Sequence, residues 1–111
     1  MKLSQVIDRL SLEVKTLQTD PDREVTGCYI GDLLSDVMAN AQEGEVWVTH
    51  QTHPNTVAVA VLRNLSGIIL ANRRRPEDAT LKKAEEERMM VASTSLSAFE
   101  AGGMLYQMLR C

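Results

Sequence analysis

The side chains best suited to chemistry follow short apolar segments, at the points where strands are expected to end. Asp32 comes just after the run Cys28–Ile30, and both histidines of the chain, His50 and His53, come after the run Glu45–Thr49. In an open parallel sheet, ligands bind outside the carboxyl ends of the strands. We therefore expect a ligand-binding site made of the polar residues at four such ends: Asp32, Thr49, His50, His53, Asn72, Arg73 and Thr94.

The distribution of charge favours an anionic ligand for this site. Residues 46–76 contain no Asp or Glu but include Arg63, Arg73, Arg74 and Arg75. This local charge of +4 leaves −7 for the rest of a chain whose net charge is −3. Pro54 suits the first turn of a helix, where free N–H groups attract anions. We expect a nucleotide or another phosphate-bearing small molecule; the alternative is a set of solvated arginines with no ligand.

No familiar catalytic motif is present. The chain lacks both the Gly-rich loop with Lys that cradles nucleotide phosphates and the Gly-x-Ser-x-Gly elbow of hydrolases. Pro54 disfavours a helix at His53, and no third ligand lies nearby, so we expect no metal and no cofactor. Cys28 is expected to pack as a small core residue. The alternative is a small phosphotransfer or hydrolytic enzyme that uses Asp32 and His50 as acid and base.

The segments around these residues alternate between strand and helix patterns. Apolar spacing, Pro positions and a capping-box pattern at Ser97–Glu100 predict helices that begin at Leu3, Leu33, Pro54, Pro76 and Ser97. Strands are predicted over residues 12–17, 28–30, 45–49, 67–71 and 89–92. The segment 67–71 is apolar without alternation, which indicates burial on both faces. The segment 12–17 is joined to Cys28 without a helix, so it can be antiparallel.

Length and composition predict a single α/β domain over residues 1–111. Alternating strands and helices with short connections are typical of a central, mostly parallel sheet, here of four or five strands with helices on both faces.

A net charge of −3 and 4% aromatic residues argue against nucleic-acid binding. No apolar run is long enough for a membrane span, and no signal peptide is apparent. The two cysteines exclude a disulfide scaffold and favour the cytoplasm.

The sequence resembles DRTGG domains from about Leu12 to Leu109. The resemblance is carried by Gly31–Asn40, by Val46–Thr49 and by the stretch from Val57 to Ala71. Such domains occur alone or as regulatory segments of phosphotransacetylases and of CBS-containing pyrophosphatases. They are related in fold to the N-terminal domain of HPr kinase/phosphorylase, so the resemblance implies that fold.

The residues that give the family its name differ at all five positions. The Asp-Arg pair falls on Thr52-His53, and the Thr-Gly-Gly triplet falls on Ala71-Asn72-Arg73. The resemblance therefore rests on the helices and strands. The loops that carry the Asp-Arg pair and the Thr-Gly-Gly triplet in the family are nevertheless two of the strand ends at which we expect the ligand-binding site.

The resemblance implies a non-catalytic module that dimerises and supports regulation, alone or with a larger enzyme partner. Gly102-Gly103 lies inside the last predicted helix, where glycine is unfavourable. We expect such a pair where another backbone must come close to the helix, either that of the sheet or that of a second subunit. A third interpretation is a scaffolding subunit of a larger complex, with no small-molecule ligand.

Overall fold

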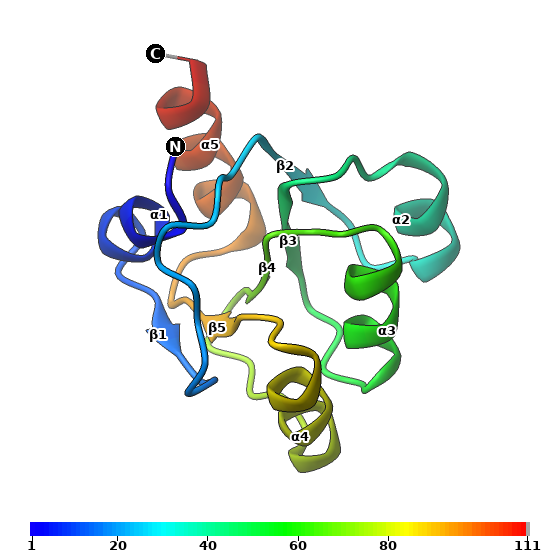
Figure 1. The fold of residues 1–111 in the computed structure, drawn as a ribbon. Helices are drawn as coiled ribbons and strands as arrows, with labels where there is room; N and C mark the ends of the chain where they lie inside the picture. Colours follow the sequence, from blue (N-terminus) through cyan, green and yellow to red (C-terminus); the bar gives the residue numbers. More distant parts are fainter. Residues whose placement is uncertain (111) are drawn as a thin grey trace.

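The computed structural model describes residues 1–110, and within them five strands form one sheet in the order β1-β5-β4-β3-β2. Strands β2, β3, β4 and β5 run parallel, and β1 pairs antiparallel with β5 (Figure 1). The bounds are β1 Glu13–Val14, β2 Gly27–Ile30, β3 Glu45–Thr49, β4 Gly67–Leu70 and β5 Val91–Ser93. The predicted α/β fold with a mostly parallel sheet is confirmed.

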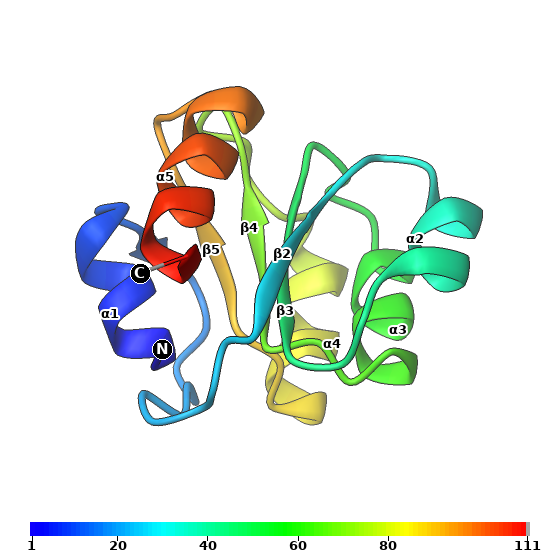
Figure 2. The same cartoon turned by 90° about the horizontal axis from the view of Figure 1, so that it is seen from above.

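Helices cover both faces of this sheet. They are α1 Leu3–Arg9, α2 Leu34–Asn40, α3 Asn55–Leu62, α4 Asp78–Glu87 and α5 Ala98–Arg110. Helices α1 and α5 lie on one face, and α2, α3 and α4 lie on the other (Figure 2). No helix in the described part of the chain is long and apolar enough to cross a membrane.

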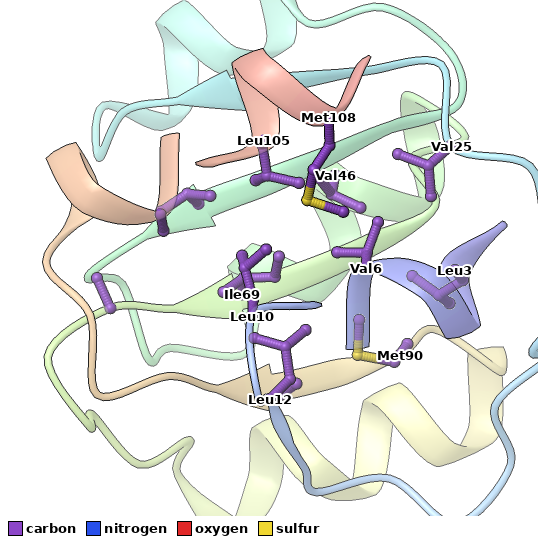
Figure 3. Close-up of a cluster of buried hydrophobic side chains, with 14 residues drawn as sticks. Leu3, Val6, Leu10, Leu12, Val25, Val46, Ile69, Met90, Leu105 and Met108 are labelled. Carbon is purple, nitrogen blue, oxygen red and sulfur yellow. The ribbon is translucent and has the colours of Figure 1, made fainter. Parts of the chain in front are cut away.

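The sheet separates two buried clusters because successive side chains of a strand point to opposite faces. In β3, Val46 and Val48 belong to the cluster under α1 and α5, whereas Trp47 belongs to the cluster under α2, α3 and α4. Figure 3 shows the first cluster, in which Val46 and Ile69 of the sheet pack with side chains of both helices. Burial of alternate residues on both faces explains why the central strands are apolar throughout.

Two strands differ from their predicted bounds by two residues or more at one end. The strand expected over residues 12–17 is limited to Glu13 and Val14: Lys15 N–H still donates to Val91 O (2.8 Å), but the acceptor for Val91 N–H is the Thr16 hydroxyl (3.4 Å) and not a backbone carbonyl. The strand expected at 89–92 begins two residues later, because Met89 N–H donates to Ala84 O and still belongs to the end of α4. The first shift arises from a contact between distant segments, and the second arises from the local hydrogen bonds that end α4.

The predicted capping box is present at the start of α5. Ser97 N–H donates to Glu100 Oε1 (3.0 Å), and Glu100 N–H donates to Ser97 Oγ (3.1 Å). These reciprocal bonds satisfy backbone donors that a helix N-terminus would otherwise leave free.

Candidate functional site

Asp32 lies directly after β2 and is bound by the segment that follows β3. Its Oδ1 accepts hydrogen bonds from Thr49 Oγ1 (2.8 Å) and from His50 N–H (2.7 Å). Its Oδ2 lies 3.0 Å from His50 Nδ1, and its main-chain carbonyl accepts from the Gln51 side-chain amide (2.9 Å). The ends of β2 and β3 are therefore joined through one carboxylate.

The loop that carries Asp32 is itself held by the core. The indole N–H of Trp47, a fully buried side chain, donates to the Gly31 carbonyl (2.8 Å). Gly31 N–H donates to Val48 O (3.2 Å), which extends the β2–β3 pairing by one residue. These two bonds fix the backbone immediately before Asp32.

The hydrogen bonds to Asp32 determine its charge. Burial by itself would raise the pKa of Asp32, but hydrogen bonds from His50 N–H, Thr49 and the His50 ring outweigh it and lower the pKa below its ordinary value. Asp32 is therefore an ionised carboxylate at neutral pH, and it orients the imidazole beside it.

His50 connects this carboxylate to the end of β4. An ionised carboxylate only accepts hydrogen bonds, so His50 Nδ1 donates to Asp32. In the neutral ring Nε2 is then the acceptor, and Asn72 Nδ2 lies 3.2 Å from it. Asn72 has φ 57°, a left-handed conformation that Asn tolerates better than most residues. Asp32, His50 and Asn72 form a row across the ends of β2, β3 and β4.

His53 lies outside this row. Its Nδ1 accepts from Asn55 N–H (3.1 Å), and its carbonyl accepts from Thr56 N–H (3.0 Å), so His53 caps the start of α3. Two of the backbone N–H groups that we expected to attract an anion therefore already donate to His53.

Arg73 and Thr94 lie beside a cavity near the end of β5. Arg73 N–H donates to Thr94 O (2.7 Å), which places the two residues side by side. The cavity has a volume of ≈ 260 Å³, and the residues that line it are all of polar or charged types: Ser11, Glu13, Lys15, Arg73, Arg75, Ser93, Thr94 and Ser95. The seven expected site residues are thus divided between the Asp32–His50–Asn72 row, the start of α3 and this cavity.

Sequence reasoning missed three neighbours of these residues. Gln51 and Arg75 belong to strand-end segments that we examined, but no sequence signal indicated that their side chains would face the site. Lys15 follows β1, and its N–H donates to Val91 O (2.8 Å) at the start of β5. The antiparallel direction of β1 places Glu13 opposite Ser93 at the carboxyl end of β5, and the Lys15 side chain reaches that end through its ion pair with Glu13 Oε1 (2.6 Å). Only the direction of β1 could have revealed this residue.

The donors at these strand ends suit an anion better than a cation. Within residues 1–110, no group of three or more His, Cys, Asp or Glu side chains is arranged to hold a metal ion. Guanidinium, ammonium and hydroxyl groups gather instead around the cavity, and such groups form charge-assisted hydrogen bonds with phosphate oxygens.

Comparison with known proteins identifies the fold. Neither a family model nor a curated protein sequence matches the chain. Among solved structures, the chain is similar to the CBS and DRTGG domains of the regulatory region of Clostridium perfringens pyrophosphatase, in complex with its activator diadenosine tetraphosphate. The TM-score is 0.73 at 15% sequence identity, over 96% of this chain and 46% of that one.

The fold is therefore DRTGG-like, as the sequence resemblance predicted. The chain spans less than half the length of that regulatory region. At 15% identity the likeness concerns the fold.

Proposed function

We propose that this chain is a non-catalytic regulatory module that binds a small phosphate-bearing molecule, such as a nucleotide, at the carboxyl ends of its strands. The observation that carries the proposal is that polar residues after β2, β3 and β4 and at the end of β5 lie along that edge, among them Arg73, whose guanidinium group has no hydrogen bond or ion pair inside residues 1–110. The similar pyrophosphatase regulatory region is in complex with a nucleotide activator, which supports the same class of ligand. Two cysteines and no disulfide framework favour the cytoplasm.

Isothermal titration calorimetry with a panel of nucleotides tests this function. The panel comprises AMP, ATP and diadenosine tetraphosphate, and each compound that binds is then incubated with the chain and analysed for turnover. Saturable binding without turnover is the expected result. The absence of binding to every compound would contradict the proposal and favour a scaffolding subunit.

A second candidate function is catalysis by Asp32 and His50. The hydrogen bond between Asp32 and the His50 ring favours it, because a carboxylate oriented toward an imidazole is the arrangement of a general base. Asn72 holds Nε2 of that ring, however, so a substrate would have to displace the amide. Turnover of a panel compound that His50→Ala abolishes would establish the enzyme and overturn the regulatory proposal.

We also propose that the module forms a homodimer through the edge of the sheet at β2. Strand β2 pairs only with β3 in the described chain, so one side of its backbone has no strand partner. Ile30 at the end of β2 is exposed, and Phe99 and Tyr106 are exposed on α5. An apolar stripe beside an open strand edge suits a second copy or a larger enzyme partner.

A further inference from the structure

The polar cavity beside β5 combines three segments that are distant in the sequence. Ser11 and Lys15 come from the region of β1, Arg73 and Arg75 from the loop between β4 and α4, and Ser95 from the segment after β5. The end of β5 is anchored to this loop, since Oγ of Ser93, the last residue of the strand, donates to Arg74 O (2.6 Å). The cavity is thus a feature of the folded chain.

The cavity carries an excess of positive charge. Three cations, Lys15, Arg73 and Arg75, line it against one carboxylate, Glu13. Lys15 Nζ is paired with Glu13 Oε1 at 2.6 Å. The guanidinium groups of Arg73 and Arg75 have no hydrogen bond or ion pair to any residue in the described chain. Lys15 and, more weakly, the charge of Arg75 lower the pKa of the Glu13 carboxyl group. Two guanidinium groups without a hydrogen bond or ion pair inside residues 1–110 therefore line one small volume.

The backbone of the loop fixes the position of Arg73. Asn72 and Arg73 both have φ 57°, the left-handed region that a residue with a long side chain rarely adopts. Asn72 N–H donates to Leu96 O (2.9 Å), and Arg73 N–H donates to Thr94 O (2.7 Å), so the segment after β5 holds both residues in this conformation. A rigid backbone lowers the entropy lost when the arginine side chain binds a ligand.

The size and lining of the cavity define the class of occupant. At ≈ 260 Å³ it is smaller than the pockets of about 300–1,000 Å³ that enclose drug-sized ligands. No aromatic side chain lines it, so it offers no surface on which a base could stack. Hydroxyl groups of Ser11 and Ser95 add donors beside the two arginines. These properties fit a phosphate group or a short phosphate chain.

We propose that this cavity binds the phosphate groups of the ligand through Arg73 and Arg75, with Lys15 and the surrounding serines as further donors. This phosphate site rests on the proposed regulatory function, and it specifies the phosphate groups as the part of the ligand that is recognised. Any base or sugar then lies outside the cavity. The protein should therefore recognise the phosphate groups of a nucleotide with little preference for the base.

The test compares three neighbouring arginines in binding assays. Inorganic tripolyphosphate is titrated into the wild-type chain and into Arg73→Gln, Arg75→Gln and Arg74→Gln. Arg74 is the matched control because it lies in the same loop and has the same charge but does not line the cavity. Arg73→Gln and Arg75→Gln should each weaken binding by about tenfold or more, whereas Arg74→Gln should change it by less than about threefold.

Competition between ligands separates failure of this inference from failure of the proposed function. Tripolyphosphate should displace ATP, and adenosine should not. If ATP binds but tripolyphosphate does not compete, or if all three substitutions weaken binding equally, the phosphate site is overturned while the regulatory function stands. If no nucleotide or tripolyphosphate binds, the proposed function fails and this inference fails with it. Unchanged thermal melting of the variants excludes unfolding as the cause.

Discussion

At the residue scale, Asp32 is the group on which the hydrogen bonds at the β2 and β3 ends converge. Its pKa is lowered in the folded state by His50 and Thr49 despite burial. A carboxyl group with a lowered folded pKa stabilises the protein above its unfolded pKa, and this stability is lost as the pH falls through the folded pKa. Asp32 should therefore contribute to the loss of stability in acid, together with Glu13 and Glu100, whose pKa values are also lowered.

Urea unfolding as a function of pH measures this dependence. Asp32→Asn should lower the unfolding midpoint at neutral pH, and the difference from wild type should shrink as the pH falls below about 4. Asp8→Asn, at a carboxylate of α1 far from this row in the sequence, is the matched control. Parallel pH profiles of wild type and Asp32→Asn would contradict the prediction.

Cys28 illustrates the opposite effect of burial. Removal from water, together with the nearby Glu45 charge, raises the pKa of the Cys28 thiol to about 12, so almost no thiolate exists at pH 8. In a Cys111→Ser chain, iodoacetamide should modify Cys28 at least on the order of a hundredfold more slowly under native conditions than in urea. Equal rates under the two conditions would indicate an accessible thiolate and a reactive cysteine.

At the element scale, the two adjacent glycines of α5 have different surroundings. A Cβ on Gly102 would lie 2.2 Å from Ile30 Cδ1, whereas a Cβ on Gly103 would meet nothing within 4 Å. The sequence left open whether the sheet or a second subunit requires the pair. Within the chain, the side chain of the edge strand β2 occupies the space beside Gly102.

Replacement of each glycine by alanine tests this difference. Gly103→Ala should stabilise the chain by about 0.5–1 kcal/mol, because alanine is the better helix former. Gly102→Ala gains the same propensity but must move Cδ1 at the far end of the half-exposed Ile30 side chain, so its stabilisation should be smaller. Chemical denaturation of both variants gives the comparison, and an equal gain at both positions would show that Ile30 exerts no constraint.

At the scale of the whole molecule, the prediction concerns association of two chains. Phe99, Gly102 and Tyr106 follow helical spacing on α5, and Gly102 lies against Ile30 at the open edge. Light scattering at micromolar concentration should give the mass of a dimer for wild type. Tyr106→Glu should give a monomer, because a charge would be buried in the interface.

Leu62→Glu is the matched control for this substitution. Leu62 is an exposed apolar residue of α3, which lies on the other face of the sheet from α5. This variant should remain a dimer. A wild-type monomer would overturn the homodimer and leave the exposed stripe to a different partner.

The sequence alone was sufficient for the features that local patterns encode. Apolar runs such as residues 67–71 and the capping box at Ser97–Glu100 indicated the alternation of strands and helices, and hence the mostly parallel sheet. The rule for parallel strands also brought Asp32, His50 and Asn72 to one edge, where the structure joins them by hydrogen bonds; that this edge binds a ligand stays a prediction. These inferences succeeded because the spacing of side chains along a strand or helix is a local property.

Tertiary structure decided how the residues at that edge divide. His53 caps α3. Arg73 shares a cavity with Glu13 and its ion-pair partner Lys15, because β1 runs antiparallel to β5 with Glu13 opposite Ser93 and because the loop after β4 adopts left-handed angles. Strand direction and loop dihedral angles depend on contacts between segments far apart in the chain, such as Arg73 N–H with Thr94 O. Those contacts form only in the folded molecule, so no local pattern could reveal which side chains share the cavity.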